Sequence, residues 1–223
     1  RLDNLSERPS ASRDLAQFIC KMTHLKDLTL RGQYHDDFYS TSSSMASSAK
    51  IETLTISSED LSERLQRLRL LRLTLMISVN VPRHHVISFS SSPSASRDLA
   101  QFICKMPHLK NLTLRGRYHD DFYSTSSSMA SSTKIETLET PVWELSERPF
   151  ASRDLAQFIC KMTHLKDLTL RGQYHDDFYS TASSMASSAK IETLKINSDD
   201  LGERPSASRD LVQFISKMTH LKD

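Results

Sequence analysis

Residues 11–30 read ASRDLAQFICKMTHLKDLTL and contain two apolar patterns of different period. The first half has apolar residues at i, i+3, i+4 and i+7, namely Leu15, Phe18, Ile19 and Met22. That spacing predicts a helix with one buried face, and Ser12 is predicted to cap its N-terminus. The second half follows the pattern L-x-x-L-x-L through Leu25, Leu28 and Leu30. Because successive strand residues point to opposite faces, this pattern predicts a short strand whose leucines face inward.

The same stretch recurs along the chain. Residues 11–56 and 151–196 are almost identical, residues 95–140 form a third copy, and residues 207–223 begin a fourth. The copies start 84, 56 and 56 residues apart, and these offsets are all multiples of 28. A repeat of about 20–29 residues with leucines at fixed offsets is the signature of a leucine-rich repeat.

Each long copy holds a second helix and a second strand. In the first copy a helix is predicted from Asp36 or Asp37 to Ala46, and a strand with inward Ile51, Leu54 and Ile56 follows it. The helix contains many serines, whose hydroxyls compete for backbone hydrogen bonds. We therefore expect this second helix to be short or partly irregular.

These units predict an α/β fold, a leucine-rich repeat solenoid (horseshoe) with parallel strands on the concave face and helices on the convex face. Residues 1–223 are expected to form a single array of about eight units, with a diverged or damaged unit at 57–94. Seven strand starts are predicted, at 25, 51, 109, 135, 165, 191 and 221. Both ends fall within a repeat, which predicts a fragment truncated at both ends and able to self-associate through uncapped units.

Composition argues against several classes of partner. The formal net charge is +2, which gives no drive toward a polyanion, so we expect no nucleic acid. No stretch approaches the roughly 18 apolar residues of a membrane span, so we expect no membrane. The three cysteines, Cys20, Cys104 and Cys160, occupy equivalent positions in separate copies. This arrangement predicts buried, reduced thiols in a cytoplasmic protein.

Two recurring motifs contain residues that can bind metals. The pattern Cys-x-x-x-His, as in Cys20 and His24, could offer a sulfur and a nitrogen to zinc, but two ligands do not make a site. A core cysteine followed by a turn histidine is the plainer interpretation. The triplet His35-Asp36-Asp37 allows metal binding or acid–base chemistry, or else its aspartates cap the next helix.

Catalysis has no support in the sequence. Serine is abundant, yet there is no G-x-S-x-G elbow and no ordered Ser/His/Asp set. We therefore expect no enzyme, no cofactor and no metal site. The basic, leucine-rich stretch 64–72 is open to three interpretations: a membrane-surface or calmodulin-binding helix, a diverged repeat, or the product of a frameshift.

The units SRDLAQFICKMTHLKDLTL at 12–30 and MASSAKIETLTI at 45–56 resemble the leucine-rich repeat region of NACHT-containing NOD-like innate immune receptors. The resemblance implies a cytoplasmic sensor whose repeats recognise a ligand or hold the receptor closed, with nucleotide binding elsewhere in the intact protein. No G-x-x-x-x-G-K-[ST] motif occurs in this chain. The Asn or Cys that the pattern usually carries after the strand is replaced by Gln33, Arg117 and Gln173.

Outward strand positions are the predicted binding residues, on a concave face that takes a protein or microbial ligand. At one of these positions the three long copies carry Thr55, Glu139 and Lys195, a neutral, an acidic and a basic residue. The predicted site comprises Asp27, Thr29, Arg31, Thr55, Asn111, Arg115, Glu139, Asp167, Arg171 and Lys195. Two functions remain open: the recognition module of an innate immune receptor, and an intracellular scaffold with no sensing role.

Overall fold

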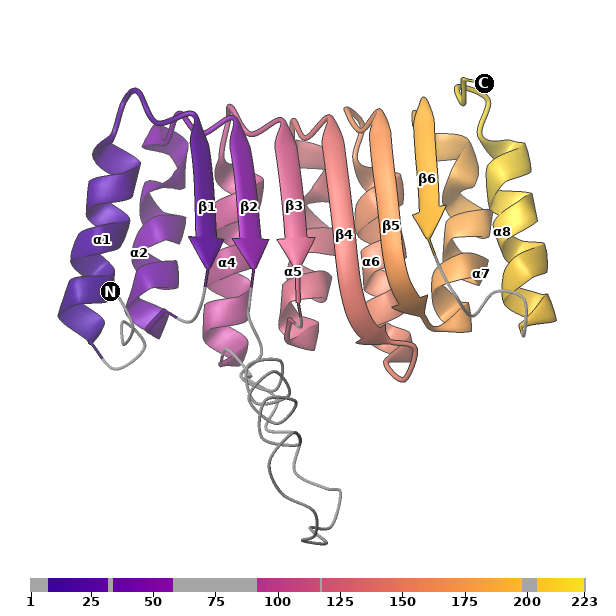
Figure 1. Cartoon of the computed structure of the whole chain (residues 1–223), viewed down its shortest axis with the longest axis horizontal. Helices are drawn as coiled ribbons and strands as arrows, with labels where there is room; N and C mark the ends of the chain where they lie inside the picture. Colours follow the sequence, from indigo (N-terminus) through magenta and orange to yellow (C-terminus); the bar gives the residue numbers. More distant parts are fainter. Residues whose placement is uncertain (1–7, 32–33, 58–91, 117, 198–203, 223) are drawn as a thin grey trace, which may run out of the picture.

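The computed structural model describes residues 8–31, 34–57, 92–116, 118–197 and 204–222 (Figure 1). Its strands are β1 (Asp27–Arg31), β2 (Thr53–Ser57), β3 (Asn111–Arg115), β4 (Thr137–Leu145), β5 (Asp167–Tyr174) and β6 (Thr193–Asn197). Its α-helices are α1 (Pro9–Lys21), α2 (Asp36–Met45), α4 (Pro93–Lys105), α5 (Asp120–Met129), α6 (Pro149–Lys161), α7 (Asp176–Met185) and α8 (Pro205–Lys217). One short 3-10 helix follows the second helix of each long copy, namely η2 (Ala46–Ser48), η3 (Ala130–Ser132) and η4 (Ala186–Ser188).

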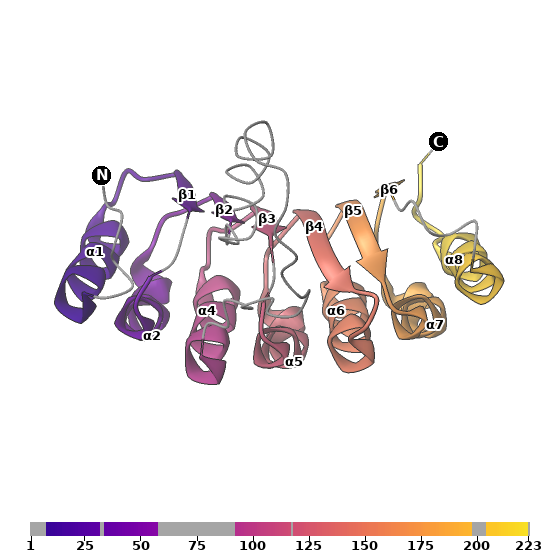
Figure 2. The ribbon, with the colours of Figure 1, turned by 60° about the horizontal axis from the view of Figure 1, so that its bottom comes forward.

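The strands form one all-parallel sheet in the order of the sequence, from β1 to β6. Helices cover one face of this sheet, and the whole arrangement bends into an arc with the strands on its inner side (Figure 2). The prediction of an α/β fold built from repeating helix–strand units is therefore confirmed. Most of the expected unit at 57–94 lies outside the described residues, and β2 pairs directly with β3, Thr53 opposite Asn111.

The strand predicted to start at 221 is absent from the described residues, because Leu221 and Lys222 have no strand conformation. A single backbone bond nevertheless continues the ladder there, with the Lys222 N–H donating to the Glu192 carbonyl at 2.8 Å. The equivalent bond at β3 joins the Lys110 N–H to the Glu52 carbonyl at 2.8 Å. Residue 222 thus occupies the position that precedes a strand in every other unit.

The start of the first helix differs from the prediction. Helix α1 begins at Pro9, with Arg8 at the N-cap, so Ser12 lies within the helix and does not cap it. Proline favours the first helical position because its missing N–H would be unpaired there. The buried Ser12 hydroxyl instead accepts a bond from the His35 N–H at 3.4 Å. In the copy at residues 151–196, Ser152 repeats this contact with His175 at 3.1 Å, so this serine links a helix to the loop of the next unit.

The second helix of each copy is short and ends in 3-10 turns, as predicted. Its cap was predicted wrongly, because His35 and not an aspartate occupies the N-cap, and the His35 Nδ1 accepts from the Asp37 N–H at 3.2 Å. Asp36 and Asp37 lie in the first turn, where the helix dipole favours negative charge. Serine hydroxyls bond back to carbonyls three residues earlier, as Ser44 does to Thr41 at 2.8 Å.

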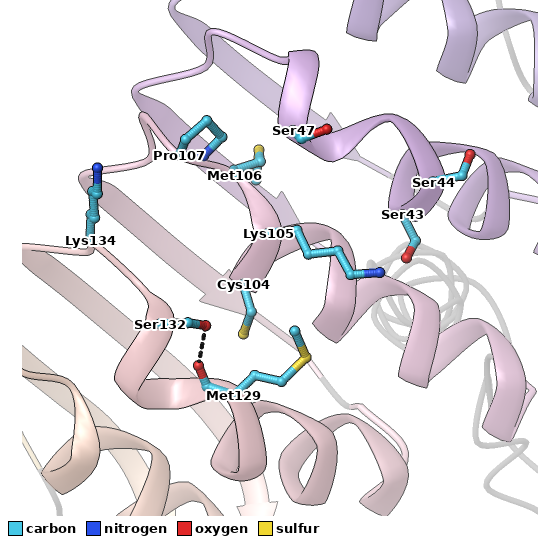
Figure 3. A pocket seen from close by; sticks show the side chains of 10 residues that line it. All are labelled: Ser43, Ser44, Ser47, Cys104, Lys105, Met106, Pro107, Met129, Ser132 and Lys134. Atoms are coloured by element: carbon cyan, nitrogen blue, oxygen red, sulfur yellow. Dashed lines mark hydrogen bonds between the residues drawn. The ribbon is translucent and has the colours of Figure 1, made fainter.

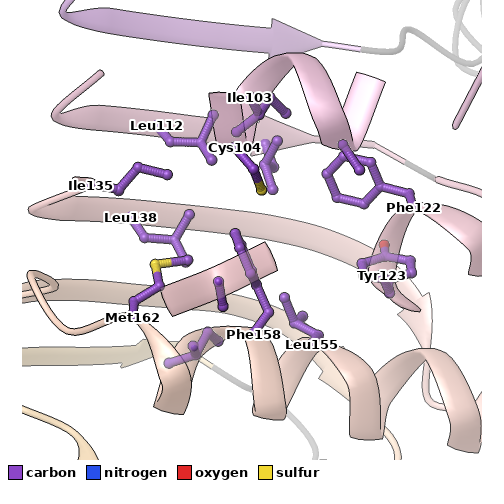
Figure 4. Close-up of a cluster of buried hydrophobic side chains, with 14 of the residues drawn as sticks. Ile103, Cys104, Leu112, Phe122, Tyr123, Ile135, Leu138, Leu155, Phe158 and Met162 are labelled. Carbon is purple, nitrogen blue, oxygen red and sulfur yellow. The ribbon is translucent and has the colours of Figure 1, made fainter. Parts of the chain in front are cut away.

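The core lies between the sheet and the helices, where the inward leucines and isoleucines of the strands meet the helix stripes (Figure 4). Tyrosine hydroxyls tie neighbouring strands together at the edge of this core. The Tyr174 hydroxyl donates to the carbonyls of Thr140 at 2.9 Å and Arg171 at 3.3 Å. Tyr118 does the same for Ile56 at 3.3 Å and Arg115 at 3.2 Å. These tyrosines therefore satisfy backbone carbonyls of two neighbouring strands.

Candidate functional site

The candidate site is the face of the sheet opposite the described helices (Figure 2), called here the open face. The strand register aligns its outward residues in rows that run across the strands. The first row contains Asp27, Thr53, Asn111, Thr137, Asp167 and Thr193, and the second contains Thr29, Thr55, Thr113, Glu139, Thr169 and Lys195. Every one of these side chains is exposed or half-buried, while the leucines between them face the core.

A third row lies near the strand ends. Arg31, Ser57 and Arg115 are in register on β1 to β3, and Pro141, Arg171 and Asn197 are in register on β4 to β6. Arg115 and Arg171 are exposed. All ten predicted residues therefore lie in strands on the open face, as the alternation of the sequence requires; for Arg31 this placement rests on its backbone register.

Charge is distributed unevenly over the open face. The first strand of each copy carries an acid or amide at its start and an arginine four residues later, as in Asp167 and Arg171. The second strand of each copy carries a threonine at its first outward position and the variable residue, at position 55, 139 or 195, at its second outward position. Glu139 lies beside Arg171, with 3.7 Å between Oε1 and Nη2, so one variable residue is already paired across strands. The Asn111 amide donates to the Thr53 hydroxyl at 3.3 Å.

A further row of charged side chains, which the sequence analysis did not predict, runs along the edge of the sheet where the strands begin. It alternates base and acid through Lys26, Glu52, Lys110, Glu136, Lys166, Glu192 and Lys222. Ion pairs join Lys26 to Glu52 at 3.1 Å, Lys166 to Glu136 at 3.2 Å, and Lys222 to Glu192. The hydrogen bond from Lys222 lowers the pKa of the Glu192 carboxyl. The sequence signal for this row was the alternation of the motifs HLKD or HLKN, whose lysine lies just before a strand, with KIET, whose glutamate takes the equivalent position before the next strand.

The cysteines lie in the core, as predicted, and away from the open face. Cys20, Cys104 and Cys160 are buried, and burial raises the pKa of the Cys104 and Cys160 thiols to about 12 and raises that of Cys20. These thiols are therefore protonated near neutral pH and poor nucleophiles. Among the described residues, no group of three or more His, Cys, Asp and Glu is placed to hold a metal ion.

Comparisons with known proteins assign no family. No protein-family model matches the chain, and no curated protein matches it at a significant level. Within the described ranges, no helix has the length and apolar character needed to cross a bilayer. The open face is therefore described by its own geometry, as a polar surface on which charged groups recur along the strands.

Proposed function

We propose that the chain is a leucine-rich repeat solenoid that binds a protein through the open face and catalyses nothing. The observation that carries this proposal is where the copies differ. Copies of nearly identical sequence place a threonine, a glutamate and a lysine at the second-row positions 55, 139 and 195. The core is untouched by these changes, while the charge pattern of the surface is altered, which is how a repeat scaffold changes partners while keeping its fold.

The spacing of the rows supports a protein partner. Neighbouring strands lie about 4.8 Å apart, so equivalent residues of successive copies, such as Arg115 and Arg171, stand about 10 Å apart. A folded surface or a helix can present matching groups at that interval, since one heptad of a helix rises about 10.5 Å. The mixture of acids and bases favours a partner with its own mixed charge pattern over a polyanion.

Two settings for this binding remain. The resemblance to NOD-like receptors favours a cytoplasmic sensor that recognises a microbial or protein ligand, with a NACHT domain in the intact protein. The alternative is an intracellular scaffold that holds another protein without sensing. Coding sequence upstream of residue 1 separates them, because a NACHT domain there supports the sensor and its absence supports the scaffold.

Binding through the open face is tested by selecting peptides from a displayed library on the immobilised chain. The selected peptides are then measured against Glu139→Lys and Lys195→Glu. We expect each reversal to weaken binding about tenfold or more for peptides that contact it, with an unchanged circular dichroism spectrum. The matched controls are Lys134→Glu and Lys190→Glu, which reverse exposed charges at equivalent positions outside the rows. Unchanged affinity in both open-face variants would move the contact to the helices or loops.

A further inference from the structure

A groove lies on the helix side of the molecule, between the 3-10 turn of the first copy and helices α4 and α5 (Figure 3). Its volume is about 420 Å³, within the range of small-molecule sites. The lining residues are Ser43, Ser44, Ser47, Cys104, Lys105, Met106, Pro107, Met129, Ser132 and Lys134. This groove is separate from the open face, because the sheet and core lie between them.

The counterparts of Lys105 in later copies make hydrogen bonds to the preceding helix. The Lys161 ammonium donates to the Ser127 carbonyl at 3.5 Å, and Lys217 donates to the Ser183 carbonyl at 2.9 Å, each crossing to the preceding helix. Lys105 donates to Gln101 in its own helix at 2.9 Å, and Lys161 also makes the equivalent bond, to Gln157 at 3.3 Å. An ammonium has three N–H groups, so Lys105 retains donors for a ligand.

One sequence difference between the long copies lies at this groove. Pro107 lines it, whereas Thr23, Thr163 and Thr219 stand at the equivalent position elsewhere. The copies differ at few positions, and a proline beside the groove makes its rim more apolar than the threonine would. Figure 3 shows Lys134 and Pro107 toward one side of the groove and the Lys105 amino group toward the other, with Cys104 and Met129 between them.

The lining favours one kind of ligand by charge and polarity. The middle consists of the sulfur-containing side chains of Cys104, Met106 and Met129, and the Cys104 thiol is neutral because burial raises its pKa to about 12. Two lysines stand at the rim, and no carboxylate is among the lining residues. Methionine side chains adapt to apolar ligands of varied shape. The groove thus combines sulfur-containing apolar side chains with two lysines and has no carboxylate in its lining, although the Asp98 carboxyl lies close enough to interact with Lys105.

We propose that this groove binds a small organic anion, with its carboxylate at Lys105 and its apolar chain against Met106 and Met129. Lys134 adds a second positive charge at the other side of the groove. The test ligand is decanoate, kept below its micellar concentration and titrated into the full chain by calorimetry. We expect saturable one-site binding, and expect Lys105→Gln to weaken it about tenfold, with a smaller loss for Lys134→Gln.

Three controls decide the proposal. Lys190→Gln removes the lysine equivalent to Lys134 in the copy at residues 151–196, so decanoate affinity should not change. Decylammonium has the same chain with the opposite charge and should bind at least tenfold more weakly. Bound decanoate should slow thiol labelling of Cys104 more than that of Cys160 in the same molecule. The proposal would be overturned if decanoate did not bind, if decylammonium bound as tightly as decanoate, or if Lys190→Gln weakened decanoate binding as much as Lys134→Gln.

Discussion

Helices α1 and α6 carry the same residues from Ala11 to Lys21 and from Ala151 to Lys161, yet their apolar stripes have different surroundings. Phe18 is 61% exposed and Met22 38% exposed, whereas Phe158 and Met162 are each 1% exposed. Helix α6 packs between α5 and α7, while α1 is the first described helix and contacts α2 on one side. Identical sequence therefore gives the same helix, but the neighbouring unit determines how much of it is buried.

This difference is expected of a one-dimensional array, in which each unit is stabilised by its own sequence and by its two neighbours. The inward strand leucines depend less on position along the array, since Leu30 and Leu170 are both buried. Val212 and Ile215 on α8 are exposed at the other end of the described sheet, where Ala156 and Ile159 of α6 are buried. The apolar helix residues of the interior units should therefore contribute most to the free energy of unfolding.

The sharpest test of this comparison truncates the same residue in both helices. Phe158→Ala should destabilise the protein by about 3–5 kcal/mol, because it leaves a cavity between α5, α6 and their strands. Phe18→Ala should cost under about 1 kcal/mol, because its ring is mostly in contact with water. Chemical denaturation followed by circular dichroism measures both. Equal losses would mean that Phe18 is covered in solution.

The repeating unit was predictable from sequence because its periods are physical: 3.6 residues for the helix stripe and two for the strand. The α/β class, the parallel units and the placement of the predicted site residues in strands on one face followed from them. The role of Ser12 was not predicted, although Pro9 at the first helical position was a usable signal. The cap of the second helix was misassigned because aspartate is the commoner cap, while histidine holds that place here.

Other features depend on neighbours that sequence does not specify. The direct pairing of β2 with β3 joins residues separated by a diverged segment, and no local pattern sets that partner. The hydrogen bonds of Lys105, Lys161 and Lys217 also differ, since Lys161 and Lys217 donate to the preceding helix and Lys105 donates to its own, although α4 and α6 differ only at Ser94 and Phe150. Side-chain choices of this kind are decided by packing after the fold has formed.

Thiol labelling sharpens the comparison in a single molecule. Cys20, Cys104 and Cys160 are all buried, but Cys20 lies in α1, whose outer side lacks a described neighbour. Local opening of an end unit requires less free energy than opening an interior unit. Cys20 should therefore label at least about tenfold faster than Cys160, a difference of ~1.4 kcal/mol in opening free energy. Peptide mass spectrometry resolves the three sites, and equal rates would indicate cooperative opening of the whole array.

A smaller effect is expected where two interior units differ by one hydroxyl. The Ser126 Oγ is buried without a hydrogen-bond partner among the described residues, and Ala182 fills the equivalent position of the next copy. Ser126→Ala should stabilise the protein by about 1 kcal/mol, because a buried unpaired hydroxyl costs about 1–3 kcal/mol. The reverse change, Ala182→Ser, is the matched control and should destabilise by a similar amount. Destabilisation by Ser126→Ala would reveal a water-mediated bond at that hydroxyl.

The smallest expected effect is electrostatic: a carboxyl of α6, but not its counterpart in α1, should make the free energy of unfolding depend on pH. Burial raises the pKa of the Asp154 carboxyl, with the Asp120 charge adding to it and Arg153 and Lys161 opposing it. A carboxyl whose folded pKa exceeds its unfolded value favours its neutral form in the fold, so its charge costs stability at neutral pH. That cost disappears as pH falls through the folded pKa toward the unfolded one.

Asp154→Asn should therefore stabilise the protein at pH 7 by less than about 1 kcal/mol, because the carboxyl is partly in contact with water. The gain should shrink as pH falls below the folded pKa and vanish near pH 3.8, the ordinary value of an aspartate. Asp14→Asn is the matched change in α1, where the carboxyl is exposed and its removal relieves no burial cost. Denaturation midpoints of both variants from pH 3 to pH 7 provide the measurement. A gain in stability from Asp154→Asn that stays constant with pH would show that the asparagine amide acts through hydrogen bonding and that the charge of the half-buried Asp154 costs no stability.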